Sequence, residues 1–179
     1  ILKGETLRTQ GLTLKQRDYF LVVSRLVRYK RVDVIVDACN ELGLPLVVIG
    51  DGMEKRVLKD RARKNITFID RHLTDDELAS YYGSCRAFIH AADEDFGIVA
   101  VEALAAGKPV ISFRGSAVSE IIDRHTGVTF NQQTKHAIMN ALKSFDKIQF
   151  DPEKATKRAQ IFSEERFLRE FKEKIDSLI

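Results

Sequence analysis

Residues 87–113, AFIHAADEDFGIVAVEALAAGKPVISF, decide the fold of this chain. They have the pattern of a strand over 87–90, a helix over 97–106 that ends at Gly107, and a second strand over 109–113. Both strand patterns are apolar at nearly every position, which is typical of strands covered on both faces. A strand, a helix and a strand in this order predict one unit of a parallel α/β sheet.

The helix over 97–106 carries a single charged residue, Glu102, among small and apolar neighbours. A helix that is apolar on all sides is expected to be buried, and a buried carboxylate is costly unless a polar group meets it. That partner is either a bound ligand or a structural ion pair. Because the helix starts just after Glu94 and Asp95, its free N–H groups at residues 96–99 form a candidate anion site.

The same alternation of strand and helix patterns extends over most of the chain. The other strand patterns cover residues 19–24, 46–50, 65–70 and 127–130, and the other helix patterns cover residues 32–42, 53–63, 74–82, 117–123, 133–145, 152–160 and 163–178. We therefore predict an α/β fold, with a doubly wound parallel sheet of about six strands and helices at the C-terminal end.

The chain divides into three predicted parts. Residues 1–17 are expected to be a linker or interdomain segment, 18–150 the sheet domain, and 151–179 a helical extension of that domain. The last helix has a broad apolar face, formed by Phe167, Leu168, Phe171, Ile175 and Leu178. We expect this face to pack on the domain's own sheet, and the alternative is a partner domain.

Composition narrows the class of protein. The 179 residues are 44% hydrophobic and 31% charged, and the formal net charge of +3 is too small and too evenly spread to indicate nucleic-acid binding. Cys39 and Cys85 lie in apolar contexts without metal-binding spacing, so we expect both to be buried and reduced. No apolar run reaches the roughly 18 residues of a membrane span, and the expected location is cytoplasmic.

Polar residues gather where the predicted strands end, which is where open parallel sheets bind ligands. These positions are Ser24, Arg25, Lys30, Gly50, Asp51, Gly52, Arg71, His72, Asp93, Glu94, Asp95, Gly115, Ser116 and Glu120. Two cations, Arg25 and Lys30, beside a helix N-terminus suit a diphosphate. Taken singly, the cations could be solvated, the glycines could serve turns, and His72 and His90 could be packing or surface residues.

A metal site is the alternative for the acidic run Asp93 to Asp95. Its Asp-x-Asp pattern occurs in metal-dependent enzymes that use nucleotide sugars, where two carboxylates hold Mg²⁺ or Mn²⁺. Because the helix N-terminus with Arg25 and Lys30 can neutralise a diphosphate alone, we predict no metal and no cofactor.

The run from Glu94 to Glu102, within EDFGIVAVEALAAGKPVI, resembles the Glu-x7-Glu signature of the family 4 retaining glycosyltransferases, which have the two-domain GT-B fold. Supporting matches follow in the family's order: Ser24-Arg25-Leu26 with Lys30, the turn Gly50-Asp51-Gly52, and Gly115-Ser116 with Glu120. The resemblance covers about residues 18–175. It departs from the family at Arg31 and Ser116, where glycine is usual, so Arg31 is either a third cation near the phosphates or a solvated one.

The resemblance implies the C-terminal, donor-binding domain of such an enzyme. It implies that Arg25 and Lys30 hold the diphosphate, that Glu94 contacts the donor sugar and that Glu102 accepts hydrogen bonds from ribose. The base would lie against Gly50, Gly52 and the segment 68–73, which includes Arg71. Backbone N–H groups for phosphate or sugar would come from Phe96, Gly97, Ile98 and Val99. The reaction implied is hexosyl transfer with retention, in which fixed positive charge stabilises the departing diphosphate.

The form EDFGIV most resembles mannosyltransferases of polysaccharide assembly, of the O-antigen type, and implies GDP-mannose as donor. The implied partners are an N-terminal acceptor-binding domain and a glycan or lipid-linked acceptor, and a lipid-linked acceptor would place the intact enzyme at a membrane. Two other functions remain open: a non-catalytic nucleotide-sugar-binding module, and a sugar-nucleotide epimerase of the same fold. A flavodoxin-like signalling domain is a third possibility, but it would leave Glu102 unexplained.

Overall fold

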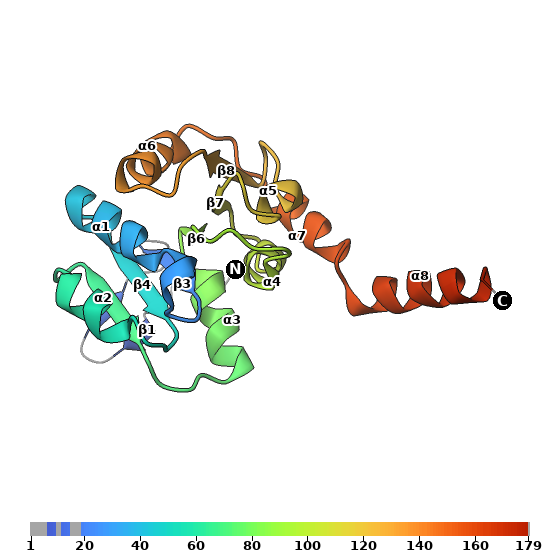
Figure 1. Cartoon of the computed structure of the whole chain (residues 1–179), viewed down its shortest axis with the longest axis horizontal. Helices are drawn as coiled ribbons and strands as arrows, with labels where there is room; N and C mark the ends of the chain where they lie inside the picture. The colour runs from blue at the N-terminus through green and yellow to red at the C-terminus, as the bar shows by residue number, and fades with distance from the viewer. Residues whose placement is uncertain (1–6, 10–11, 15–18, 179) are drawn as a thin grey trace.

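A computed structural model describes residues 7–9, 12–14 and 19–178 of the chain, and its centre is a six-stranded parallel sheet (Figure 1). In sheet order the strands are β5 (Ile66–Ile69), β4 (Leu46–Ile49), β3 (Phe20–Val23), β6 (Ala87–His90), β7 (Val110–Phe113) and β8 (Gly127–Phe130). The predicted doubly wound sheet of about six strands is confirmed. Two further strands, β1 (Leu7–Thr9) and β2 (Leu12–Leu14), form a separate antiparallel pair. The expected linker over 1–17 lies largely outside the described residues.

The direction of winding reverses between β3 and β6, which are neighbours at the centre of the sheet. Phe20 pairs with Ala87 and Leu21 with Phe88 in parallel register. The chain runs outward from β3 through β4 to β5, and then returns to the centre at β6 before it runs outward on the other side. In open α/β sheets such a reversal marks the usual position of a ligand, beyond the carboxyl ends of the two central strands, and here the loops after β3 and β6 lie at that position.

Helices cover both faces of the sheet. Their bounds are η1 (Arg28–Lys30), α1 (Val32–Leu42), α2 (Lys55–Arg61), α3 (Asp75–Ser84), α4 (Ile98–Ala105), α5 (Val118–Ile121), α6 (Lys135–Phe145), α7 (Pro152–Gln160) and α8 (Glu164–Asp176). Phe20 and Val22 of β3 share one core with α1, α2 and α6, whereas Leu21 lies in a second core with α3, α4, α5 and α7. Alternate residues of a buried strand thus serve opposite cores.

Local signals in the sequence account for several helix boundaries. Thr74 and Glu77 form a capping box at the start of α3, and Asp151 caps α7 through the N–H groups of Glu153 and Lys154. Each cap satisfies N–H groups that would otherwise have no partner. Both cysteines are free and buried, as predicted.

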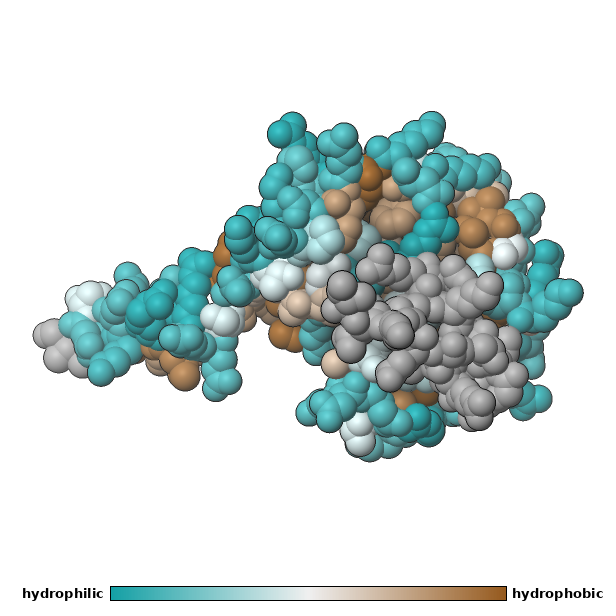
Figure 2. All heavy atoms as spheres, turned by 180° about the vertical axis from the view of Figure 1, so that it is seen from behind, coloured by the Kyte–Doolittle hydropathy of each residue, from teal (hydrophilic) through white to brown (hydrophobic). Residues whose placement is uncertain are grey.

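The last helix, α8, extends away from the sheet domain (Figures 1 and 2). Its apolar side chains Phe167, Leu168 and Phe171 are each more than half exposed. The prediction that this face packs on the domain's own sheet is therefore wrong. The sheet face is already covered, because Ala155 and Ala159 of α7 fill the position beside α4. Within the described part of the chain, no helix has the length and apolar character needed to cross a membrane.

Candidate functional site

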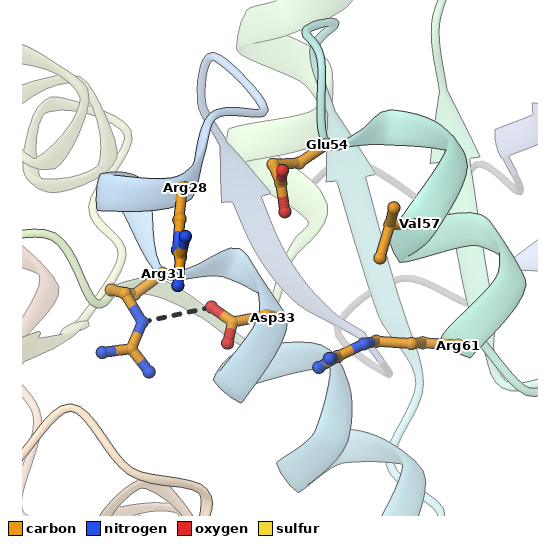
Figure 3. Close-up of a pocket in the computed structure, with 6 residues that line it drawn as sticks. All are labelled: Arg28, Arg31, Asp33, Glu54, Val57 and Arg61. Carbon is orange, nitrogen blue, oxygen red and sulfur yellow. Dashed lines mark hydrogen bonds and ion pairs between the residues drawn. The ribbon is translucent and has the colours of Figure 1, made fainter.

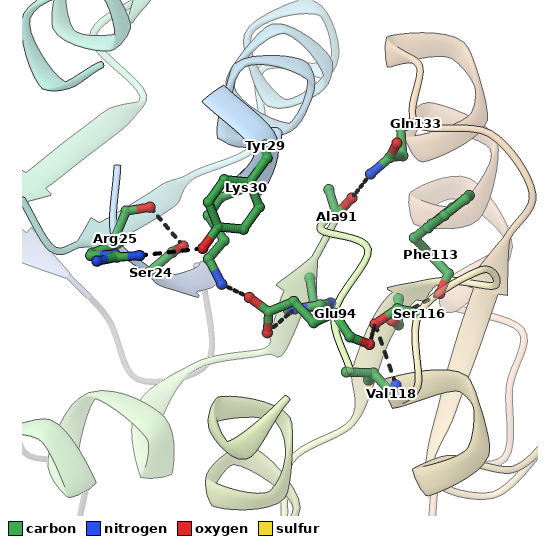
Figure 4. Close-up of polar contacts among 12 residues, drawn as sticks. Ser24, Arg25, Tyr29, Lys30, Ala91, Glu94, Phe113, Ser116, Val118 and Gln133 are labelled. Carbon is green, nitrogen blue, oxygen red and sulfur yellow. Dashed lines mark hydrogen bonds and ion pairs between the residues drawn. The ribbon is translucent and has the colours of Figure 1, made fainter. Parts of the chain in front are cut away.

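Three side chains meet at the point where the winding reverses. Lys30 at the end of η1 forms an ion pair with Oε1 of Glu94, in the loop after β6 (Figure 4). The other carboxylate oxygen, Oε2, lies 3.2 Å from Nε2 of His90, the last residue of β6. The side chains of Lys30 and Glu94 are only 18% and 16% exposed. The Glu94 carboxylate, which is mostly buried, therefore connects the loop after β3 with the end of β6.

The environment of His90 favours its neutral form. Burial, and secondarily the positive charge of Lys30, lower the pKa of His90 to about 4. The Glu94 carboxylate is itself ion-paired with Lys30. An ionised carboxylate only accepts hydrogen bonds, so Nε2 of the neutral imidazole carries the hydrogen that points to Glu94.

The backbone of the Glu94 loop is fixed by neighbouring elements. Its carbonyl oxygen accepts a hydrogen bond from the N–H of Ala117 at 2.9 Å, and the hydroxyl of Ser116 lies 3.4 Å from the same oxygen. On the other side, Gln133 donates to the carbonyl of Ala91 at 2.7 Å (Figure 4). Ser116, where the resembling family has glycine, is buried and supports the loop. The carboxylate of Glu94 is thus presented by a rigid loop.

The helix N-terminus predicted beside Glu94 is present. Gly97 caps α4 with φ 87°, and a Cβ atom at this position would lie 2.2 Å from Cγ2 of Val118. Glycine is therefore required both by the backbone conformation and by the close approach of α5. The first helical hydrogen bond joins the N–H of Ala100 to the carbonyl of Gly97. The N–H groups of residues 96–99 precede it, and their contact with an anion stays a prediction.

Arg25 and Lys30 lie on the same loop, with Tyr29 between them. The Arg25 guanidinium donates to the Tyr29 hydroxyl at 3.4 Å, which lowers the pKa of Tyr29, and Nζ of Lys30 lies 4.9 Å from the centroid of the Tyr29 ring (Figure 4). Arg25 is exposed. The two predicted cations are thus brought together at the carboxyl end of β3.

The turn after β4 packs tightly against the loop that carries Arg25. A Cβ atom on Gly50 would lie 1.9 Å from the carbonyl oxygen of Ser24, and one on Gly52 would lie 2.3 Å from that of Leu26. This close approach alone requires both glycines. Their predicted contact with a nucleotide base stays a prediction.

Glu102 is exposed, and it lies on the same side of α4 as Ile98. The prediction of a helix buried on all sides is therefore wrong. Glu102 Oε2 accepts a hydrogen bond from the hydroxyl of Tyr82 in α3 at 2.8 Å, and the two residues line a cavity of about 400 Å³ between α3 and α4. Burial and the nearby carboxylate raise the pKa of Tyr82, so the phenol stays protonated and donates. Because α4 consists mostly of small apolar residues, its sequence could not reveal which side is exposed.

Arg71 forms an ion pair with Glu77 in the first turn of α3. Its guanidinium donates to both carboxylate oxygens of Glu77, at 2.6 and 3.1 Å. This bond, together with the Thr74 N–H, lowers the pKa of Glu77 to about 2. The predicted contact of Arg71 with a nucleotide base is not shown and stays a prediction.

The arginines on either side of Lys30 and Tyr29, Arg28 and Arg31, line a separate cavity of about 510 Å³ toward α1 and α2 (Figure 3). Arg31 has φ 52°, a left-handed conformation that explains why the resembling family has glycine there. Its guanidinium donates to Asp33 at 3.2 Å. Arg31 is therefore ion-paired and not simply solvated, and its position near the phosphates stays a prediction.

Among the described residues, no three His, Cys, Asp or Glu side chains are grouped so that they could hold a metal ion. This does not test the prediction that the site uses no metal or cofactor, which stays a prediction.

Reasoning from the sequence missed three residues that shape the site. His90 was open to interpretation as a packing residue, although its place at the end of a central strand, four residues before Glu94, was a signal. Gln133 and Tyr82 carried no signal, because each reaches the site from an element distant in the sequence.

The sequence matches a known protein family and is similar to several proteins of that family. The family described as "Glycosyl transferases group 1" matches residues 4–162. The chain is 33% identical over 116 residues to an uncharacterized glycosyltransferase of Methanocaldococcus jannaschii, covering 62% of this chain and 33% of that protein. It is 28% identical over 134 residues to O-antigen chain mannosyltransferase C of Escherichia coli, covering 70% of this chain and 36% of that protein. The chain thus spans about a third of these curated relatives.

Among solved structures, the chain resembles HepE of Anabaena in complex with UDP. The TM-score is 0.77 at 20% sequence identity, and the match covers 90% of this chain and 49% of that one. At this identity the similarity supports the fold alone. It agrees with the doubly wound parallel sheet described above, a Rossmann-like fold.

Proposed function

The chain belongs to the group 1 glycosyl transferases, and on that premise we propose that it binds the nucleotide-sugar donor of a retaining glycosyltransferase. The observation that carries the proposal is the ion pair of Lys30 and Glu94 at the reversal point of the sheet, beside the N-terminus of α4. A cation, a carboxylate and a helix N-terminus at one edge of the sheet match the mixed chemistry of a sugar diphosphate.

In the proposed complex, the diphosphate takes Lys30, Arg25 and the N–H groups at the start of α4 as partners. As the sugar leaves, negative charge develops on the diphosphate, and cations already held in place stabilise it without a reorganisation cost. Glu94 accepts hydrogen bonds from hydroxyl groups of the sugar and so positions it. The structure of HepE of Anabaena is a complex with UDP, which supports a nucleoside diphosphate as ligand here.

The nucleoside end of the donor is assigned to Glu102. Its carboxylate is exposed and has one hydrogen bond, from Tyr82, so it retains acceptor capacity for the two hydroxyl groups of ribose. The Gly50 to Gly52 turn and Arg71 are assigned to the base, as the resemblance implies.

The proposed donor is GDP-mannose, and the proposed acceptor is a glycan or a lipid-linked glycan. The EDFGIV run and the similarity to an O-antigen chain mannosyltransferase support mannose. Because the relatives are about three times as long as the matched region, we propose that an acceptor-binding domain completes the enzyme. A cytoplasmic location remains an expectation.

Calorimetry with GDP-mannose, GDP, UDP-glucose, UDP and ADP, with and without EDTA, tests this function. We expect GDP and GDP-mannose to bind, with affinity unchanged by EDTA. Binding of uridine nucleotides alone would replace the proposed donor, and loss of binding in EDTA would indicate a metal site. A failure of every nucleotide to bind would contradict the donor-binding function itself.

The variant Lys30→Ala tests the phosphate end. We expect GDP affinity to fall by about 1.5–3 kcal/mol, the usual contribution of a hydrogen bond to a charged group. Lys143→Ala, which removes an exposed lysine from α6, is the matched control and should bind GDP like the unaltered protein. Equal affinities in the two variants would remove Lys30 from the site.

A further inference from the structure

One buried atom beside the candidate site lacks a partner. Of the buried side-chain nitrogen and oxygen atoms in the described part of the chain, Nδ1 of His90 alone has no hydrogen-bond partner. The His90 side chain is only 7% exposed, and its other ring nitrogen contacts Glu94. An unsatisfied buried polar atom is costly, so a native structure that keeps one invites a functional explanation.

We propose that His90 is a positioning residue for Glu94, which holds the carboxylate in place and balances its charge when an anionic ligand draws Lys30 away. This inference rests on the proposed function. Lys30 contacts Oε1 of Glu94 and His90 contacts Oε2, so either partner can remain when the other moves.

The need for a second partner follows from competition for Lys30. In the ligand-free protein its ammonium group is already paired with Glu94, and a diphosphate is a stronger competitor for the same cation. Once Lys30 turns to the phosphate, Glu94 is left as a mostly buried anion with a cost of desolvation. A lysine is flexible enough to make this exchange, whereas the His90 ring is confined at the end of β6 and stays.

The charges around His90 predict a proton linkage. The titratable groups near His90 are Glu94, which contacts it, and Lys30, whose charge acts on it. Its neighbour on β7, Ser112, and the first turn of α4 are uncharged. Asp93 and Asp95 of the loop after β6 are exposed to solvent. When Lys30 moves away, the repulsion it exerts on a proton at His90 falls and the attraction of Glu94 is no longer balanced. Nδ1 is the free nitrogen, so a proton from solvent would bind there.

Two measurements test the inference, one with ligand and one without. In the first, GDP binding near pH 6 is followed by calorimetry in two buffers with different ionisation enthalpies. We expect the unaltered protein to take up a fraction of a proton on binding, and His90→Phe and His90→Gln to take up none at this site. His90→Gln keeps an N–H donor for Glu94 but cannot take up a proton, so it should bind GDP about threefold more weakly than the unaltered protein, whereas His90→Phe, which loses both, should bind about tenfold more weakly.

The second measurement uses the ligand-free protein. In Lys30→Met, NMR titration should show the pKa of His90 above its value in the unaltered protein, with the signals of exposed His136 on α6 serving as the reference. An unchanged His90 titration in Lys30→Met, or equal GDP affinity and proton uptake in His90→Phe and the unaltered protein, would overturn the inference. A raised His90 pKa without any nucleotide binding would support the charge coupling and contradict the proposed function instead.

Discussion

The two ends of the candidate site differ in how firmly the protein holds its carboxylate. At the proposed phosphate end, beside Lys30, the carboxylate is that of Glu94, which is 16% exposed, contacts Lys30 and His90, and has its backbone bonded to Ala117. At the proposed nucleoside end, Glu102 is exposed and accepts a hydrogen bond from Tyr82. Glu94 is therefore held from two sides in the ligand-free protein, whereas the Glu102 carboxylate faces solvent.

The fold explains this difference. Glu94 follows a central strand at the reversal point, where the loops after β3 and β7 and the start of α6 all converge. Glu102 lies on the exposed side of α4, where its carboxylate contacts Tyr82 of α3. Glu94 is held more firmly than Glu102 because more helices, strands and loops lie next to it.

Gly97→Ala is expected to have the largest effect, because it disrupts the start of α4 at the rigid end. The left-handed φ of 87° and the 2.2 Å approach to Val118 Cγ2 together should lower the free energy of unfolding by about 3 kcal/mol. Denaturant unfolding measures this. Gly83→Ala in α3 is the control, since its Cβ would meet no atom within 4 Å, and it should be neutral or stabilising by up to about 1 kcal/mol. If Gly97→Ala and Gly83→Ala changed the free energy of unfolding equally, glycine would not be required at the start of α4.

Glu102→Ala tests the open end. GDP affinity should fall by about 2 kcal/mol, because the lost acceptor is charged, and guanosine without phosphates should lose affinity by a similar factor. Lys30→Ala should leave guanosine binding unaffected. Calorimetry with both ligands separates the two ends.

Tyr82→Phe removes the present partner of Glu102 while keeping its carboxylate. This variant should bind GDP at least as well as the unaltered protein. If Glu102→Ala bound both ligands normally, the ribose assignment would be wrong.

The free energy of unfolding should depend on pH through His90, which contacts Glu94. The expected change per pH unit is small. The pKa of His90 is about 4 when folded, below its ordinary value of about 6.5, so the unfolded chain binds the proton more tightly. This contribution to stability is present above about pH 6.5 and is lost as the pH falls toward 4, by at most about 1.4 kcal/mol per pH unit.

Urea unfolding at a series of pH values measures that slope. His90→Phe should flatten it, whereas His136→Phe, on the exposed side of α6, should leave it unchanged. The same slope in all three proteins would show that His90 is not held neutral.

Much of the fold was predictable because its signals are local. The six strands are short runs made mostly of apolar residues, and the caps at Thr74 and Asp151 are set by residues within three positions. The grouping of Arg25, Lys30 and Glu94 was also predictable, because parallel strands bring their carboxyl ends to one edge. The destination of the apolar face of α8 was not, because amphipathicity shows that a face is apolar without showing what covers it.

The sequence by itself determined the alternation of strands and helices, the order of polar residues at strand ends and the glycine that starts α4. Only the tertiary structure decided that Glu94 is held by Lys30 and His90, that Glu102 is exposed beside Tyr82, and that α8 leaves the sheet. The physical reason is the range of the interactions. Backbone periodicity and capping act within a few residues, whereas burial and ion pairing depend on which distant elements are adjacent after folding.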